Sequence, residues 1–303
     1  MELIPSSTWF SAEPHWRWLI VFYYVFSGLA GGCYFIATLL DLRGRPEDRP
    51  LVRAGYYAAL PWLAIGGLLL MFDLTRPERF WHLLLENHTF EPIFKYWSPI
   101  SIGSWAMLAF GFLAFLSFIG ALAEGGRLRW QRARALLGPS ALGRVIGILG
   151  SLLGLYVAGY AGVLLAVTNR PIWADTPLIG MLFLVSAASI SAAFMILLAQ
   201  RYDWRVPSMF AIERMDLRLI TLELLVLVGM VVSLGPVARV WLSAWGVLLV
   251  VGAVGIGMLL PMALHRRRDW LGERTPAFAA VLVLLGGVIL RTVIVFSAEG
   301  VHL

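Results

Sequence analysis

Apolar residues in this protein are grouped into eight long runs, and this grouping is the feature that most limits how the polypeptide can fold. Each run has about 18 to 25 residues, the length that a helix needs to cross roughly 30 Å of hydrocarbon. We therefore predict an all-α membrane protein with eight transmembrane helices. Their predicted bounds are 18–40, 52–73, 99–122, 144–167, 178–199, 217–234, 241–262 and 277–298.

Composition supports a bilayer environment. Apolar residues make up 60% of the 303 residues and charged residues only 14%, whereas soluble domains are about half apolar and about a quarter charged. This excludes a soluble enzyme. The first run follows a segment with Glu2 and Glu13 but a single basic residue, Arg17, so we expect no cleaved signal peptide.

Basic residues are divided unevenly between the two sides of the predicted helices. Of the 24 Lys and Arg residues, 17 fall in loops on one side, which are residues 41–53, 123–144, 200–218 and 263–276. Because positive charge is retained in the cytoplasm, we predict that this side is cytoplasmic and that both termini face outward. The net charge of +6 therefore reports topology, and we expect no nucleic-acid partner.

Two loops of the predicted outer side contain arginines that run against this trend. These loops, 74–98 and 168–177, are also rich in aromatic and acidic residues. Trp and Tyr favour the membrane interface, which explains several of the aromatic residues without any function. Arg76, Arg79 and Arg170 have no such explanation, and we regard them as candidate functional residues.

Few ionisable residues lie within the predicted spans, where their energetic cost makes function the default hypothesis. Asp73 ends the second span on the outer side, and Arg291 lies near the outer end of the eighth. Glu223 lies about six residues into the sixth span, roughly 9 Å from the inner face. We expect Glu223 to take part in a proton relay or in a structural ion pair.

Tyrosines form a second set of polar groups towards the outer ends of the spans. Tyr23 lies one to two turns below this end of the first span, and Tyr160 of the fourth lies roughly 13 Å below the surface. A buried Tyr is more often a core residue than a ligand contact. The outer ends of spans two and four, however, also carry Asp73, Asn169, Arg170 and Trp173. A pocket lined by aromatic walls, hydrogen-bond donors and an acid suits a quinone.

Histidine and cysteine are scarce where a redox metal would need them. All five histidines lie at span ends or in loops, whereas a transmembrane haem takes axial ligands that project inward from helices. Cys33 is the only cysteine, so the protein cannot hold an iron–sulfur cluster by itself. We therefore expect no haem, no iron–sulfur cluster and no other metal site in this chain.

Four stretches of the sequence carry specific motifs. They are SGLAGGCYF (27–35), LLLMFDLTRPERFWHLL (68–84), SPISIGSW (98–105) and GYAGVLLAVTNRPIWAD (159–175). They resemble the NrfD/PsrC family, the quinone-reactive membrane anchors of polysulfide reductases, related molybdoenzymes and multihaem nitrite reductases. The resemblance covers the first four or five spans and is weaker from about residue 178.

The resemblance implies an architecture and a location. It implies two four-helix bundles, of which residues 1–170 contain the quinone site and residues 171–303 form the second bundle. It also implies a multi-pass protein of the bacterial cytoplasmic (inner) membrane, with menaquinone or ubiquinone as its redox partner.

The resemblance also assigns roles by position. Tyr160 is similar to the tyrosine that contacts the quinone ring, and Asp73 to the acid that handles its protons. Gly28 lies in the first motif and is assigned to the same site. Where some members have a His, this protein has Tyr23, which can still donate one hydrogen bond.

Together, these features predict a respiratory membrane subunit that oxidises quinol, or reduces quinone, near the outer face. Electrons would pass to a peripheral, ferredoxin-like iron–sulfur subunit and through it to a molybdopterin or multihaem catalytic subunit. Partner docking is assigned to Arg76, Arg79 and His82 in the outer loop. Protons would leave through Asp73, or cross the membrane by way of Asp216, Arg218, Glu223 and Arg291.

Two other functions fit the same hydropathy. A proton-coupled secondary transporter would also have several spans with a few buried charges, although inverted repeats would be expected and none is evident in the sequence. A structural anchor without a quinone site is the second alternative. Copurification of an iron–sulfur protein together with quinone would favour the quinone-reactive subunit over both.

Overall fold

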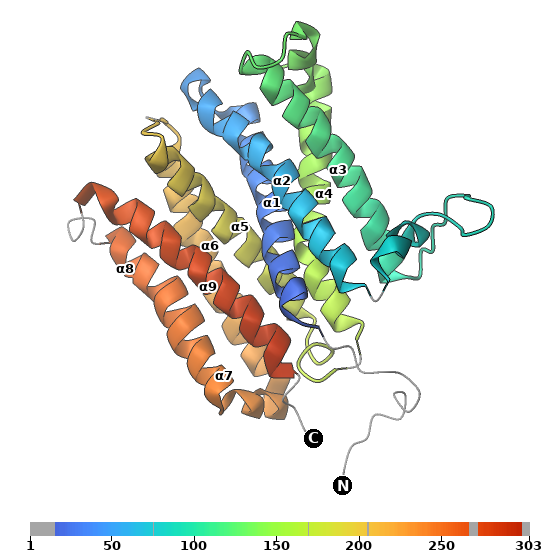
Figure 1. Ribbon diagram of the computed structural model, residues 1–303. Helices are drawn as coiled ribbons and strands as arrows, with labels where there is room; N and C mark the ends of the chain where they lie inside the picture. The colour runs from blue at the N-terminus through green and yellow to red at the C-terminus, as the bar shows by residue number, and fades with distance from the viewer. Residues whose placement is uncertain (1–15, 75, 169, 205, 267–271, 299–303) are drawn as a thin grey trace.

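The computed structural model describes residues 16–74, 76–168, 170–204, 206–266 and 272–298 (Figure 1). Within these ranges the chain is helical without a β-strand, and eight helices are long and apolar enough to cross a membrane. The predicted fold class is therefore confirmed. The first five spans contain α1 (Trp18–Arg43), α2 (Arg49–Asp73), α3 (Pro99–Glu124), α4 (Ala141–Ala166) and α5 (Leu178–Arg201).

The last three spans are less regular. The sixth contains α6 (Met209–Leu234), and the eighth is α9 (Thr275–Ser297). The seventh runs continuously from α7 (Ala244–Val247) through a π-helical stretch, Leu248–Leu259, into α8 (Leu260–Arg266). Such stretches are rare and widen the helix locally, so this span differs in geometry from the other seven.

The sixth helix begins at Met209, eight residues before the predicted start of its span. The prediction was wrong there because charged residues interrupt the apolar run, although the helix continues and buries Glu213 and Asp216 on one face. Glu223 consequently lies fourteen residues into α6, about 21 Å from its first residue rather than 9 Å. It is a residue of the helix middle.

The start of α1 and the end of α9 lie at the same end of the molecule, as an even number of spans requires (Figure 1). The connections from α2 to α3 and from α4 to α5 lie at this end too. We call it the tyrosine end, because the Tyr23–Tyr160 region described below is closest to it. The other end, which carries the basic loops, is called the arginine-rich end. The sidedness of the two ends in the membrane stays a prediction.

Helix α1 is the central element, since it packs against α2, α4, α5 and α9. Glycines permit the closest of these approaches. A Cβ on Gly31 of α1 would overlap the backbone of Gly154 in α4, so Gly31 has no room for a side chain, and a Cβ on Gly154 would be in tight contact with Phe110 and Gly31. Small residues commonly bring membrane helices together in this way. One apolar core extends from α1 through α5 to α9, and the division into two bundles at residue 170 stays a prediction.

Ion pairs fix the arginine-rich end. Arg49, at the start of α2, forms ion pairs with Asp41 of α1 and Glu124 of α3. Asp48 accepts hydrogen bonds from the backbone and the hydroxyl of Ser208 (3.0 and 2.6 Å), which joins the α1–α2 connection to the start of α6.

Candidate functional site

Tyr160 is held at the start of α3 by its hydroxyl. The side chain is buried, and the hydroxyl donates a hydrogen bond to the carbonyl oxygen of Pro99 (2.8 Å). Its ring lies against Gly103, where a Cβ would overlap the ring atoms. On its other side the ring stacks on Tyr156, with 5.9 Å between centroids. Tyr160 therefore has one defined position between α3 and α4.

Two adjacent tyrosines of α1 meet Tyr160. The Tyr23 hydroxyl has only the sulfur of Met107 as a partner, at 3.8 Å, and sulfur is a weak acceptor. The Tyr24 hydroxyl is buried and forms no hydrogen bond with a described residue. Tyr24 interacts electrostatically with Tyr23, Tyr160 and Asp73. Tyr23, Tyr160 and Asp73, which the sequence placed in one predicted pocket, thus lie in the same region, together with Tyr24, which the sequence analysis missed.

These four residues, Tyr23, Tyr24, Tyr160 and Asp73, are called the tyrosine cluster below. Asp73 is the last residue of α2 and is half-buried. A buried hydroxyl without a partner costs about 1–3 kcal/mol, so the Tyr24 hydroxyl is expected to have a partner beyond the described residues of the chain. A quinone oxygen is an acceptor that would satisfy it, and the donor set of the cluster therefore fits a quinone or quinol.

Three other residues predicted for the quinone site lie apart from this cluster or outside the described residues. Trp173 is fully buried against α9, where its indole N–H donates to the carbonyl oxygen of Ile294 (2.8 Å). Gly28 faces α5. A Cβ added to Gly28 would lie 3.0 Å from the Cβ of Ala187 and 3.4 Å from Nη2 of Arg291. Asn169 lies outside the described residues.

Arg170 is half-buried beside Trp173, with its guanidinium carbon 5.8 Å from the centre of the indole ring. Trp173 in turn stacks on Trp16 (5.1 Å), whose ring meets the edge of Tyr24 at 6.4 Å. Arg170 and Trp173 therefore reach the tyrosine cluster only through aromatic packing.

The connection between α2 and α3 folds as a compact loop over the tyrosine end. Its 3-10 helix, Pro77–Leu83, is followed by a backbone bridge between Leu85 and Pro92. Glu86 accepts hydrogen bonds from the backbone N–H groups of Thr89 and His88 (both 2.6 Å), which lower the pKa of its carboxyl group below the usual 4.5. These bonds fix the turn of the loop.

The surface of this loop combines basic and aromatic side chains. Arg76 and Arg79 are exposed, and His82 shares a hydrogen bond with the side chain of Asn87 (2.8 Å). The exposed aromatic residues are Phe80, Phe90, Phe94, Tyr96 and Trp97. Such a patch, cationic and aromatic, has the composition of a protein-binding surface.

A second polar set surrounds Arg291 in the middle of the helices. Arg291 is fully buried, and its Nη1 donates to the Ser186 hydroxyl and the Gly287 carbonyl oxygen (both 3.0 Å). Ser186 also hydrogen-bonds Glu223, which interacts electrostatically with Arg291. Glu223 and Arg291, both predicted for the proton pathway, therefore lie on either side of Ser186, although they are not close enough to form an ion pair.

The buried carboxyl groups continue along α6 towards the arginine-rich end. Asp216 is fully buried, accepts a hydrogen bond from Ser189 (3.0 Å) and interacts electrostatically with Glu223 and Glu213. We call Glu213, Asp216 and Glu223 the acidic row. Arg218 points away from this row, because its side chain is exposed.

Sequence analysis missed three members of this second set: Ser186, Ser189 and Glu213. The two serines have the three-residue spacing of one helix face in α5, which could have been read as a polar stripe. Among the described residues, no group of three His, Cys, Asp or Glu side chains is arranged as metal ligands.

Comparison with known proteins matches the whole architecture rather than the motifs alone. The family model "Polysulphide reductase, NrfD" matches residues 10–301. One of the chains of the polysulfide reductase of Wolinella succinogenes is 27% identical over 97% of this protein and 98% of its own length. Protein NrfD of Escherichia coli is 25% identical over 94% of this protein and 95% of its own length.

A shorter match links the protein to another reductase. One of the subunits of the selenate reductase of Mesobacillus selenatarsenatis is 32% identical over 90 residues, which are 30% of this protein and 19% of that subunit. With eight apolar helices and a family match that includes all of them, this chain is a multi-pass membrane protein and belongs to the NrfD family of polysulfide reductase-type membrane subunits.

Proposed function

We propose that this chain is the quinol-oxidising, or quinone-reducing, membrane subunit of a respiratory oxidoreductase in a bacterial cytoplasmic membrane. One observation carries the proposal: three tyrosine hydroxyls and Asp73 converge at one end of the helices, and the Tyr24 hydroxyl has no partner among the described residues. The family supports a redox complex, because two relatives are named as parts of polysulfide and selenate reductases.

The residues of the tyrosine cluster have distinct roles in this proposal. Tyr24 donates a hydrogen bond to one oxygen of the ring, and Tyr23, whose hydroxyl contacts only the Met107 sulfur among the described residues, is a second donor. The Tyr160 hydroxyl gives its only proton to Pro99, so Tyr160 acts as an acceptor for a quinol hydroxyl. Asp73 accepts a proton, since a half-buried carboxylate at a helix end can pass that proton to water. A bound quinol supplies two electrons and two protons on oxidation, and burial of the cluster excludes water from its hydroxyls.

Electrons need an acceptor outside this chain, and the loop at 74–98 is the surface where we place it. The loop begins directly after Asp73 and lies at the same end of the molecule as the tyrosine cluster, and its arginines and several of its aromatic side chains are exposed (Figure 1). We propose that a ferredoxin-like iron–sulfur subunit docks there through Arg76, Arg79 and His82. That subunit would pass electrons to a molybdopterin or multihaem catalytic subunit.

The assignment is tested in the whole complex by two variants, Tyr160→Phe and Asp73→Asn. Each removes one polar function and keeps the shape of the side chain. We expect each to lower quinol-dependent turnover by about 10²-fold, the scale of a lost proton-transfer group. Activity of the catalytic partner with an artificial dye should not change, because the dye bypasses the membrane subunit.

Tyr156→Phe is the matched control for these variants. Tyr156 lies one turn before Tyr160 and stacks on it, but its side chain is 38% exposed and it is not part of the cluster. We expect the control to keep quinol-dependent turnover. Normal turnover in both Tyr160→Phe and Asp73→Asn would contradict the site and favour a structural anchor.

A second function, proton transfer across the membrane, is favoured by the acidic row of α6. Its three buried carboxyl groups extend from the arginine-rich end towards Arg291. Ionisable residues on one helix face inside a membrane protein commonly form proton relays. We propose that this row carries protons during turnover of the same complex. A proton-coupled transporter would use the row without a redox partner, so copurification of an iron–sulfur subunit separates the two functions.

A further inference from the structure

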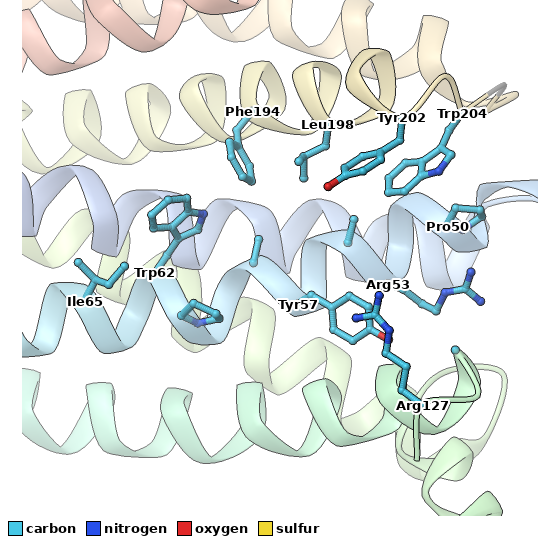
Figure 2. A pocket seen from close by; sticks show the side chains of 14 residues that line it. Pro50, Arg53, Tyr57, Trp62, Ile65, Arg127, Phe194, Leu198, Tyr202 and Trp204 are labelled. Carbon is cyan, nitrogen blue, oxygen red and sulfur yellow. The ribbon is translucent and has the colours of Figure 1, made fainter. Parts of the chain in front are cut away.

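An open groove of about 800 Å³ lies between α2 and α5, away from the tyrosine cluster. Figure 2 shows Phe194, Leu198 and Tyr202 facing α2, which contributes Arg53, Tyr57 and Trp62. Arg127, just beyond the end of α3, lies at the mouth. Neither the proposed quinone site nor the acidic row includes any residue of this groove.

The mouth of the groove carries two positive charges without a matching negative charge. Arg53 and Arg127 both interact electrostatically with the Tyr57 hydroxyl, and the Arg127 guanidinium lies 5.4 Å from the centre of the Tyr57 ring. Neither arginine forms an ion pair with a described residue. The neighbouring acid, Glu124, is already paired with Arg49. The mouth therefore has the charge to hold an anion.

The remainder of the groove suits a hydrocarbon chain. From Arg53 at the mouth to Ile65 at the far end there are twelve helical residues, which is about 18 Å, close to the thickness of one leaflet of hydrocarbon, about 15 Å. The wall between them is mainly apolar and aromatic.

We propose that this groove binds an anionic glycerophospholipid. Arg53 and Arg127 hold its phosphate, and an acyl chain lies along the wall towards Ile65. Basic pockets between transmembrane helices bind anionic headgroups in this way. A quinone is a less suitable occupant because it is neutral and leaves both guanidinium groups uncompensated. A second copy of the protein is also a less suitable occupant, because it would have to place an acidic residue at the mouth.

The test uses the purified complex, stripped of lipid in a neutral detergent and titrated in native mass spectrometry. The probes are dioleoyl phosphatidylglycerol, which is anionic, and dioleoyl phosphatidylcholine, which has the same acyl groups and no net charge. We expect phosphatidylglycerol to bind roughly 10- to 30-fold more tightly, with one high-affinity lipid for each copy of this protein. Arg53→Gln combined with Arg127→Gln should abolish the difference between the two lipids.

The matched control is Arg129→Gln combined with Arg132→Gln, which removes the same charge from exposed positions of the same loop, outside the groove. We expect this control to keep the preference. Dye-dependent and quinol-dependent turnover should stay normal in both double variants, which verifies that each is folded. Equal loss of preference in the control would overturn the proposal, because the whole basic surface would then attract the lipid.

A second variant tests the acyl chain without changing charge. Ala58 lines the groove, and Ala58→Phe should fill it and lower phosphatidylglycerol affinity about tenfold. Unchanged affinity in Ala58→Phe would show that the lipid lies elsewhere. Displacement of phosphatidylglycerol by an equal amount of menaquinone would overturn the proposal in favour of a quinone in the groove. A dimer that excludes the lipid would overturn it in favour of a second copy of the protein.

Discussion

The buried guanidinium of Arg291 donates a hydrogen bond from Nε to the backbone carbonyl oxygen of Tyr24 (3.3 Å). This contact joins the two polar sets of the molecule. The side chain of Tyr24 belongs to the tyrosine cluster, while Arg291 interacts with Glu223 of the acidic row. One turn of α1 thus touches both the proposed quinone site and the proposed proton path.

Removing the Arg291 charge should destabilise the protein. In Arg291→Gln, Ser186 and the Tyr24 carbonyl oxygen lose a charged donor and Glu223 loses a nearby cation, and a hydrogen bond to a charged group contributes about 1.5–3 kcal/mol. We expect a lower midpoint of thermal unfolding for the purified complex. The double variant Arg291→Gln with Glu223→Gln should recover part of the loss, because neither charge then remains buried alone. A double variant less stable than Arg291→Gln would contradict this interaction between the two residues.

The position of Tyr160 should depend on the absence of a side chain at residue 103. Gly103→Ala places a methyl group where the Tyr160 ring lies, so the ring must move from its bond with Pro99. A misplacement of about 1 Å can cost 10²-fold in rate, and we expect quinol-dependent turnover to fall roughly 10- to 100-fold.

Gly111→Ala is the control for this change. Gly111 lies in the same helix, and its added Cβ would meet only Leu63 at 3.4 Å, an ordinary contact. Turnover should be near normal. Similar losses in both variants would mean that α3 tolerates no added methyl group, and the effect on Tyr160 would then not be specific.

The eight spans were predictable because each apolar run had the length that a bilayer imposes. The start of α6 was not, since buried carboxyl groups such as Asp216 break the apolar run that marks a span. A hydropathy profile marks any ionisable residue as the end of a span, whereas the structure buries the Asp216 carboxyl group against Ser189 of α5. Only the three-dimensional packing of α5 on α6 reveals that partner.

The site was predictable in outline but not in its membership. Tyr160 and Asp73 followed from motifs, whereas Tyr24 required knowledge of which face of α1 meets α4. The motif around Trp173 predicts a ligand contact, which stays a prediction, whereas the hydrogen bond from its indole N–H to the Ile294 carbonyl oxygen, 121 residues away in sequence, was not predicted. Sequence spacing does not predict pairings between distant helices.

The fold of the loop between α2 and α3 should depend on Glu86. Glu86→Gln weakens the hydrogen bonds to His88 and Thr89, so their amide hydrogens should exchange roughly two- to tenfold faster. The lowered pKa of Glu86 means that its carboxylate supports the turn above pH 4.5 and loses this role as the pH falls through the lower value. Hydrogen exchange followed by mass spectrometry should therefore show constant protection of these two amides from pH 7 to 4.5. A loss of protection that begins above pH 5 as the pH is lowered would contradict this role.

The acidic row should determine the number of protons moved for each electron. Asp216→Asn removes the central carboxyl group of the row and keeps a group that can accept from Ser189. If the row is a relay, quinol-dependent electron transfer continues while proton translocation decreases, because the two use different residues. We expect the proton-to-electron ratio of complexes in proteoliposomes, measured with a pH-sensitive dye, to fall by at least about half. Arg218→Gln, an exposed position two residues away, is the control and should leave the ratio unchanged. A normal ratio in Asp216→Asn would exclude the row as the path, and the protons would then be released only at Asp73.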